Sequence, residues 1–273
     1  PKHNKKETIS CTCGQLSSTI FPPGSLLLTA DIAVLAAMGI EACPLPTAVL
    51  TAQTGYEGYH SVSLASHMEA IGALERAGIT FAGILSGYLA SPEAAYQTAE
   101  FVDTFHHPGV TYLCDPVLGD QGRVYKGFTD ASIEAMRSLA EKADFLTPNL
   151  TEFCLLTGTE MDAIMNREKE DKDALFAFLL KKLPPFPQTD LVITGIPLKG
   201  EKSGKEICNL IISKGSSHPV IFPHLAAPIQ NGDLFAAVLL AARLHKEGLV
   251  PSVNKAGQFI AKGITAAQKE HTP

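Results

Sequence analysis

Asn231, Gly232 and Asp233 directly precede an apolar segment with helical periodicity that runs to about residue 245. A glycine at a helix start lets backbone N–H groups point at an anion, and the helix dipole adds partial positive charge there. This arrangement suits a phosphoryl group in transfer, which carries negative charge on its oxygens. Asp233 could accept a proton from a substrate hydroxyl beside that anion. The alternative is that Asp233 only caps the helix, because Gly-Asp before a helix is common.

Asn149 and Glu152 form a second candidate group, just after the short apolar segment 144–146. Their three-residue spacing matches a capping box, in which each side chain bonds the backbone N–H of the other residue. In the functional interpretation, both side chains face ATP phosphates and a Mg²⁺ ion held through water. Mg²⁺ usually keeps several waters and takes only one or two carboxylates. This motif by itself does not decide between the two interpretations.

Asp115 ends a predicted strand over residues 110–114. A carboxylate at the end of a buried strand is costly unless it is paired, so a cation or a hydrogen-bond network is expected there. Asp120, which lies between Gly119 and Gly122, has the composition of a turn.

The elements that must position these residues alternate between apolar β-type segments and amphipathic helical segments. The predicted strands cover residues 48–52, 81–85, 110–114, 144–146, 191–194 and 206–213. The predicted helices cover residues 28–38, 64–77, 92–105, 131–143, 172–183 and 234–246. Several strands are continuous apolar runs, as expected when helices cover both faces of a parallel sheet. The pattern predicts an α/β three-layer sandwich around a central, mostly parallel sheet. Because no linker divides the chain, residues 1–273 are predicted to form a single domain.

Ligands of open parallel sheets bind beyond the carboxyl ends of the strands. The candidate residues fall at such ends: Asp115 after one predicted strand, Thr147 and Asn149 after the next, and Gly195 after another. The segment 199–205, rich in Lys and Gly, is predicted to be an exposed hairpin or flap.

Composition excludes several classes of function. The net charge is -6 and no dense run of Lys and Arg occurs, which argues against a nucleic-acid or anionic-membrane partner. No apolar stretch reaches the roughly 20 residues of a membrane helix. The six cysteines lie mostly in apolar segments, which predicts reduced, buried thiols in a cytoplasmic protein.

Taken together, the motifs resemble those of the pyridoxal kinases of the ribokinase-like superfamily, in the same order and at fitting separations. They are Asp115-Pro116-Val117-Leu118-Gly119-Asp120, Thr147-Pro148-Asn149-x-x-Glu152, Val192-Ile193-Thr194-Gly195 and Gly232-Asp233-Leu234-Phe235. Thr54-Gly55-Tyr56 and Ser86-Gly87-Tyr88-Leu89 look like the two substrate-side loops of that family. These loops favour a pyridoxal kinase over the related hydroxymethylpyrimidine kinases. The resemblance covers roughly residues 25–260.

The resemblance implies an ATP-dependent kinase that phosphorylates the 5′-hydroxymethyl group of pyridoxal, pyridoxine and pyridoxamine, in salvage of vitamin B6 to pyridoxal 5′-phosphate. Asp233 would be the general base, and the backbone of Asn231, Gly232 and Asp233 would form the anion hole. The implied cation site, for Mg²⁺ with K⁺ as a further candidate, would consist of Asp115, Thr147 and Glu152. A cytoplasmic homodimer is also implied.

The remaining implied residues contact the two substrates. The ATP site would include Asn149, Glu152, Thr194, Gly195 and Gln230. The pyridine pocket would be lined by Thr54 and Tyr88, and by Thr19 according to an ungapped count back from Gly39. For Tyr88 the alternative is a plain core tyrosine, since such a ring with a polar tip commonly sits at a sheet edge.

Three features depart from the family pattern. Gln230 stands where the family usually has the first glycine of a Gly-x-Gly-Asp run, and a side chain there could crowd the phosphate. The stretch 11–20, at the expected first strand, is Ser/Thr-rich, and a last element common in the family is expected to be shortened or missing. Two alternatives therefore stay open: a degenerate homologue that binds vitamer or nucleotide without efficient transfer, and a kinase for hydroxymethylpyrimidine or a sugar.

Overall fold

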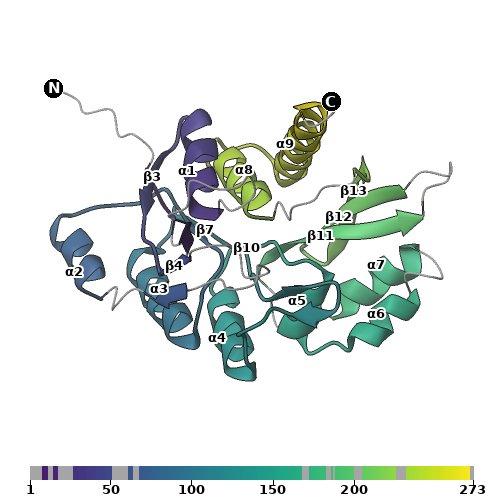
Figure 1. Ribbon diagram of the computed structural model, residues 1–273, viewed down its shortest axis with the longest axis horizontal. Coiled ribbons are helices and arrows are strands. Elements are labelled where there is room, and N and C mark those ends of the chain that lie inside the picture. The colour runs from purple at the N-terminus through teal and green to yellow at the C-terminus, as the bar shows by residue number, and fades with distance from the viewer. Residues whose placement is uncertain are drawn as a thin grey trace.

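The structure is a computed structural model that describes residues 8–11, 15–17, 27–50, 61–63, 68–167, 172–182, 186, 188–199, 205–225 and 232–270. Within these residues, eight strands form a central sheet (Figure 1). Their order across the sheet is β13 (Ser216–Pro223), β12 (Lys205–Ser213), β11 (Asp190–Lys199), β10 (Phe145–Leu146), β7 (Thr111–Cys114), β6 (Gly83–Ser86), β1 (Thr8–Cys11) and β3 (Glu41–Pro44). The strands from β11 to β3 pair in parallel, whereas β12 and β13 are antiparallel.

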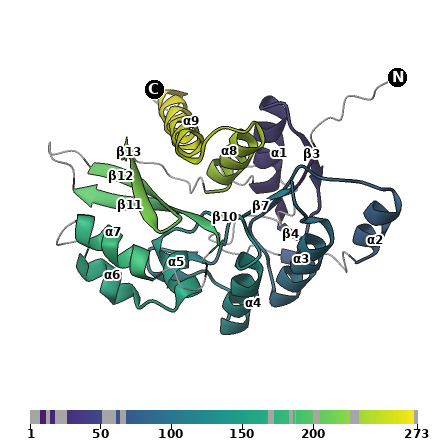
Figure 2. The ribbon, with the colours of Figure 1, turned by 180° about the vertical axis from the view of Figure 1, so that it is seen from behind.

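Helices cover both faces of this sheet, as Figures 1 and 2 show from opposite sides. One face carries α1 (Leu27–Ala37), α8 (Gly232–Leu244) and α9 (Leu249–Glu270). The other carries α3 (Pro92–Phe105), α4 (Asp130–Ala140), α5 (Leu150–Thr157), α6 (Met161–Arg167) and α7 (Lys172–Lys181). Helix α2 (Met68–Arg76) contacts α3. The predicted three-layer sandwich with a mostly parallel sheet is therefore confirmed.

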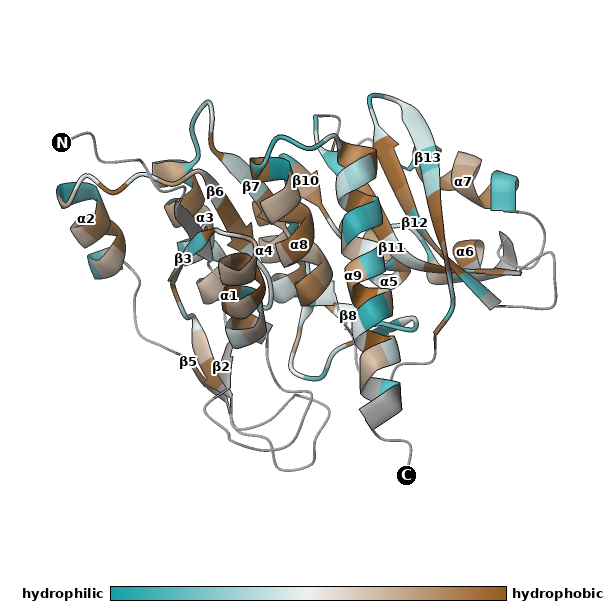
Figure 3. Ribbon diagram, turned by 90° about the horizontal axis from the view of Figure 1, so that it is seen from above, coloured by the Kyte–Doolittle hydropathy of each residue, from teal (hydrophilic) through white to brown (hydrophobic). Residues whose placement is uncertain are grey.

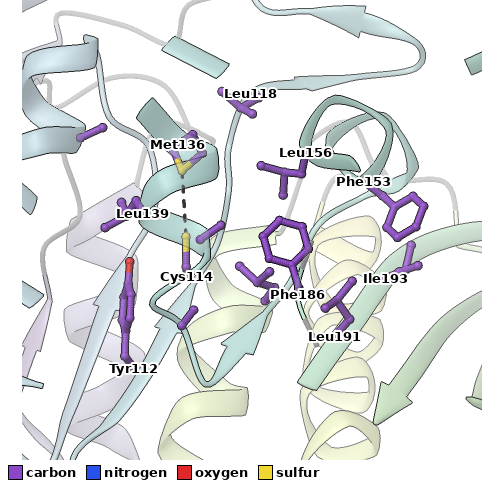
Figure 4. Packing of buried hydrophobic residues seen from close by; sticks show 14 of the residues in the cluster. Tyr112, Cys114, Leu118, Met136, Leu139, Phe153, Leu156, Phe186, Leu191 and Ile193 are labelled. Atoms are coloured by element: carbon purple, nitrogen blue, oxygen red, sulfur yellow. Dashed lines mark hydrogen bonds between the residues drawn. The ribbon is translucent and has the colours of Figure 1, made fainter. Parts of the chain in front are cut away.

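The continuous apolar strands follow from this architecture because successive side chains point to opposite faces. Ile84 and Tyr112 pack against the α3–α7 side, whereas the next residues along, Leu85 and Leu113, pack against the α1–α8 side. Figure 4 shows the first of these cores, where the thiol of Cys114 lies 4.0 Å from the sulfur of Met136. Such strands have no polar face because neither face meets water.

Helix α8 lies in the middle of one layer and is buried along nearly its whole length. Its residues 235–242 are buried, and Figure 3 shows the helix coloured as hydrophobic over most of its surface. A helix that is apolar all round is expected in such a position. The burial fixes the start of α8, where Gly232 and Asp233 lie.

Several elements differ from the sequence predictions. The strand predicted at residues 48–52 is β4 (Ala48–Leu50), which belongs to a separate sheet with β2 (Gln15–Ser17) and β5 (Ser61–Ser63) in the described residues. The first strand of the central sheet, β1, begins at Thr8, ahead of the Ser/Thr-rich stretch that was expected to hold it. Strands β3 and β13 and helix α6 were not predicted. Helix α9, which extends over 22 residues, was not predicted either.

Other predictions are confirmed in the described residues. Strands β11 and β12 pair antiparallel with Lys199 opposite Lys205, whereas residues 200–204, on which the predicted hairpin or flap falls, lie outside the described residues. The cysteines Cys43, Cys114, Cys154 and Cys208 are free thiols, and all but Cys43 are buried. None of the helices that the structure describes is long and apolar enough to cross a membrane.

Candidate active site

Asp115 follows the carboxyl end of β7 and is 5% exposed. Its backbone N–H donates to the carbonyl of Ser86 on the neighbouring strand, at 2.8 Å. Its carboxylate Oδ1 accepts a hydrogen bond from the Thr147 hydroxyl, at 2.7 Å. Burial raises the pKa of Asp115 to about 6, and the Thr147 bond opposes that rise. The expected hydrogen-bond network at this strand end is thus present, and it joins Asp115 to the residue that follows β10.

Asn149 and Glu152 form the predicted capping box at the start of α5. The Asn149 N–H donates to Glu152 Oε2 at 2.8 Å, and the Glu152 N–H donates to Asn149 Oδ1 at 3.0 Å. Glu152 Oε1 also accepts from the backbone N–H of Leu118, at 3.2 Å. Burial, and then the charge of Asp115, raise the pKa of Glu152 well above its usual range, while backbone hydrogen bonds oppose the rise. The cap is therefore also a buried carboxylate that interacts with Asp115, so the two interpretations of this motif do not exclude each other.

A short hairpin of β8 (Gly119–Asp120) and β9 (Arg123–Val124) packs on the start of α5. The Asn149 amide donates to the carbonyl of Gly119, and the Gly122 N–H donates to the Thr151 hydroxyl, both at 2.8 Å. A side chain at Gly119 would meet the Arg123 carbonyl at 2.3 Å, so the close pairing of the two strands requires glycine. The turn predicted around Asp120 is confirmed.

Gly232 and Asp233 begin α8 beside these carboxylates. A Cβ atom added to Gly232 would lie 3.7 Å from Asp115 Oδ2, which places the helix start directly against the strand-end carboxylate. Asp233 is half-buried in the first turn. Burial raises its pKa well above the usual range, and the charges of Asp31, Asp115 and Glu152 act in the same direction. A carboxylate with a raised pKa is a better proton acceptor, which is the property that a general base needs.

Thr194 and Gly195 lie next to the Asn149 segment. Thr194 forms an isolated parallel bridge with Asn149, and its N–H donates to the Pro148 carbonyl at 2.8 Å. Gly195 has a φ of 72°, and its N–H donates to the side chain of Asn209 at 3.1 Å. The structure thus brings these two residues next to the residues after β10. Contrary to the sequence prediction, Gly195 does not follow the end of a strand, because β11 continues through it to Lys199, with an irregularity in its pairing between Ile193 and Ile196.

Tyr88 follows β6 and is 8% exposed. Its ring lies edge-on to Phe128, with 5.6 Å between the ring centroids, and contacts Ala48 in a small apolar cluster. Tyr88 is therefore buried, as the alternative of a core tyrosine predicts, and it packs next to the start of β4. Thr19, Thr54, Gln230 and Asn231 lie outside the described residues.

Asp31 is a buried carboxylate that the sequence motifs do not predict for this site. Asp31 lies in the second turn of α1 and is 1% exposed, and its charge acts on Asp233. A signal was available, because Asp31 is the only charged residue of α1, a helix that is apolar except for Asp31 and Thr29. What the sequence could not show is that α1 packs against α8.

The fit of a magnesium ion rests on Asp115 and Glu152. No group of three or more His, Cys, Asp or Glu side chains among the described residues is arranged to hold a metal by itself. Two neighbouring buried carboxylates, one of which accepts a hydrogen bond from the Thr147 hydroxyl, nevertheless suit Mg²⁺, which takes one or two carboxylates and completes its shell with water and substrate phosphates.

The raised pKa of Asp115 gives a stability prediction. Because its pKa is raised from an ordinary 3.8 to about 6, the folded protein loses stability relative to the unfolded chain as the pH rises through that window. Two pKa units correspond to roughly 3 kcal/mol. Asp115→Asn keeps the oxygen that accepts from Thr147 and removes the charge, so we expect it to be more stable than the wild type by about 1–3 kcal/mol near pH 8 and nearly equal near pH 4.

Urea unfolding at both pH values, without nucleotide or divalent cation, measures this difference. Asp103→Asn is the matched control, because Asp103 is exposed and pairs with Lys142 at the surface. A wild type that is as stable as Asp115→Asn near pH 8 would contradict the prediction.

The comparisons with known proteins agree with this fold. The phosphomethylpyrimidine kinase family matches residues 28–272. The chain therefore belongs to this family, and it is a kinase of the ribokinase-like superfamily. A pyridoxal kinase of Paraburkholderia phymatum is 26% identical over 223 residues, which cover 76% of this chain and 71% of the relative.

Solved structures extend the likeness over nearly the whole chain. A candidate phosphomethylpyrimidine kinase from Bacteroides thetaiotaomicron is 30% identical with a TM-score of 0.86, covering 99% of this chain and 90% of that one. A second crystal form, solved with pyridoxal, is 31% identical with a TM-score of 0.80, covering 96% and 88%. A pyridoxal kinase from Leishmania donovani, in complex with ADP and ginkgotoxin, shares the fold at 20% identity and a TM-score of 0.75, covering 97% and 88%.

Proposed function

We propose that this kinase uses ATP to phosphorylate the 5′-hydroxymethyl group of pyridoxal, pyridoxine and pyridoxamine. The observation that carries the proposal is the start of α8, where Gly232 and Asp233 lie against the buried carboxylate of Asp115. The relative from Bacteroides thetaiotaomicron that is solved with pyridoxal supports the choice of substrate. The Leishmania donovani structure with ADP supports the choice of nucleotide.

In this mechanism Asp233 accepts the proton of the substrate hydroxyl as its oxygen attacks the γ-phosphate. The bond between the γ-phosphorus and the β,γ-bridging oxygen breaks, and ADP leaves. The backbone N–H groups at the start of α8, from Asn231 to Asp233, donate to the phosphoryl oxygens, and the helix dipole adds to their effect. The raised pKa of Asp233 favours uptake of the proton.

Asp115, Thr147 and Glu152 would hold Mg²⁺, largely through water. When bound, the ion would neutralise charge on the triphosphate. Asn149, Thr194, Gly195 and Gln230 are proposed to contact the nucleotide. A K⁺ requirement, a homodimer and a cytoplasmic location stay predictions from the family resemblance.

Glu152→Gln tests the cation site. We expect the variant to need a higher Mg²⁺ concentration for half-maximal rate and to turn over more slowly, because one of two neighbouring carboxylate charges is lost. The measurement is a Mg²⁺ titration at saturating ATP, with Glu93→Gln, an exposed acid in the first turn of α3, as control. Titration curves that coincide with those of the wild type would contradict the prediction and leave Glu152 with its capping role alone.

A second candidate function is phosphorylation of hydroxymethylpyrimidine, which the description of the matching family favours. ATP consumption with pyridoxal, pyridoxine, pyridoxamine and hydroxymethylpyrimidine, assayed side by side, separates the possibilities. We expect turnover with the pyridines. Preference for the pyrimidine would support the second function, and no turnover with any substrate would support a degenerate binding protein.

A further inference from the structure

The hairpin of β8 and β9 has no part in the proposed mechanism, although it packs on the start of α5. Its tip, residues 121–124, is exposed. Leu118, just before β8, is fully buried in the core that Figure 4 shows. A two-stranded hairpin is only marginally stable in water by itself. The position of this hairpin therefore depends on its anchored base and on its contacts with α5.

The base of the hairpin is bonded to Glu152, one of the proposed cation ligands. The Leu118 N–H donates to Glu152 Oε1 at 3.2 Å, and the Asn149 N–H donates to Oε2 at 2.8 Å. One oxygen is thus held from the hairpin side and the other from the cap of α5. The Asn149 amide also donates to the Gly119 carbonyl in β8, at 2.8 Å. A displacement of the hairpin would therefore change the orientation of the Glu152 carboxylate.

Thr151 fastens the tip of the hairpin to the same helix. Its side chain is 4% exposed, and its hydroxyl accepts a hydrogen bond from the Gly122 N–H at 2.8 Å. Gln121 and Gly122 have positive φ values of 51° and 77°, as the two central residues of a type I′ turn require. Glutamine adopts this conformation rarely. The turn at the tip is therefore less favourable than an Asn-Gly turn would be, and the bond to Thr151 helps to hold it in place.

We propose that Thr151 is a positioning residue: its bond to Gly122 holds the hairpin on α5, and the docked hairpin holds the Glu152 carboxylate in the orientation that binds the cation. The inference rests on the proposed function, in which Glu152 faces Mg²⁺. Hydrogen bonds around a metal-binding carboxylate raise its affinity because they fix the orientation of the ligand before the ion arrives. Thr151 acts one step further out, through the backbone that bonds to Glu152.

Thr151→Val tests the proposal, because valine keeps the branched shape and removes the acceptor. The probe is Mn²⁺, which takes the same oxygen ligands as Mg²⁺. Its binding in the presence of a non-hydrolysable ATP analogue is measured by the loss of the electron paramagnetic resonance signal of the free ion. We expect the affinity for Mn²⁺ to fall about threefold to tenfold, the usual effect of one hydrogen bond.

Two control variants separate positioning from a general loss of packing. Thr151→Ser keeps the hydroxyl acceptor and should bind Mn²⁺ as the wild type does. Thr98→Val removes the hydroxyl of another buried threonine, which donates to the Ala94 carbonyl within α3 at 2.8 Å. It should also leave the affinity for Mn²⁺ unchanged.

A double-mutant cycle shows whether Thr151 acts through Glu152. In the Glu152→Gln background, Thr151→Val should change the affinity for Mn²⁺ very little, because the carboxylate that the hairpin orients is gone. Equal losses of affinity in the two backgrounds, or wild-type affinity in the Thr151→Val protein, would overturn the proposal.

Limited digestion of the wild type with trypsin covers the case in which Thr151→Val does not fold. Arg123 lies at the exposed tip, so cleavage after it reports the undocking of the hairpin. If docking strengthens cation binding, the cation must strengthen docking in return. Mn²⁺ added to the protein with the ATP analogue should therefore slow this cleavage about threefold or more, relative to the analogue alone. An unchanged rate would overturn the proposal.

Failure of the proposed function looks different from failure of this inference. Neither the Mn²⁺ titrations nor the digestion requires turnover. A protein that met both expectations and phosphorylated no pyridine would overturn the proposed kinase activity and leave the role of Thr151 in cation binding supported.

Discussion

Asp233→Asn is expected to reduce turnover by about 10²–10⁴-fold while leaving ATP binding nearly unchanged. The asparagine has the same shape, so the start of α8 and its backbone N–H groups should stay in place. An amide oxygen, however, does not accept the proton of the substrate hydroxyl. The loss corresponds to the usual contribution of a positioned general base, and this is the largest effect that we expect from any single substitution in the site.

The competing interpretation makes Asp233 a helix cap, and a matched variant separates the two. Asp130 is an exposed acid in the first turn of α4, so Asp130→Asn removes the same favourable interaction with a helix dipole. If Asp233 were only a cap, both variants would lose a little stability and keep their turnover. Measuring the turnover, the melting temperature and the nucleotide affinity of both variants therefore distinguishes a general base from a helix cap. An Asp233→Asn enzyme that retained more than about a tenth of wild-type turnover would reduce Asp233 to a cap.

Gln230→Gly is expected to have the second largest effect, an increase in turnover with pyridoxal of about tenfold or more. Gln230 lies outside the described residues, and in the sequence it stands two residues before Gly232, whose backbone lies against Asp115. If the family's glycine at this place has a positive φ, a glutamine there strains the loop by about 1–3 kcal/mol or diverts it. Either outcome would loosen the N–H donors that bind the phosphoryl group.

Steady-state kinetics of Gln230→Gly measure this directly, and KM for pyridoxal should change little. Gln230→Ala is the control, because it removes the glutamine side chain without introducing a glycine, and its turnover should remain as slow as that of the wild type. A glycine variant slower than wild type would mean that the Gln230 amide itself donates to the phosphate. Gln230 would then be an adaptation of the anion site.

The parts of the fold predicted from sequence are those that local pattern determines. The capping box at Asn149 and Glu152 is a local feature, because both hydrogen bonds form within four residues. The apolar helix α8 could be predicted because its burial leaves no polar face. Strand β13 could not, since its residues are mostly exposed and it includes two prolines, so it carries no apolar alternation. Strand β3 could not be predicted either, because it is a short strand at the edge of the sheet whose four residues show no apolar alternation.

The site was predictable to the extent that its residues follow strand ends. Asp115 and Thr147 stand at the carboxyl ends of adjacent strands, so a parallel sheet brings them together, and their hydrogen bond follows. Asp31 comes from a helix, and its approach to Asp233 depends on how α1 packs on α8. Such tertiary packing leaves no pattern in the sequence, which is why a charged residue in an apolar helix was not connected to the site.

The most direct measurement of the central claim is the transfer of phosphate itself. The wild-type protein would be incubated with Mg²⁺, pyridoxal and ATP labelled in its γ-phosphate, and the products separated and identified. We predict that the label appears in pyridoxal 5′-phosphate, at a rate far above that of the Asp233→Asn protein. Label that stayed in ATP, appeared only in inorganic phosphate, or entered hydroxymethylpyrimidine but no B6 vitamer would contradict the account.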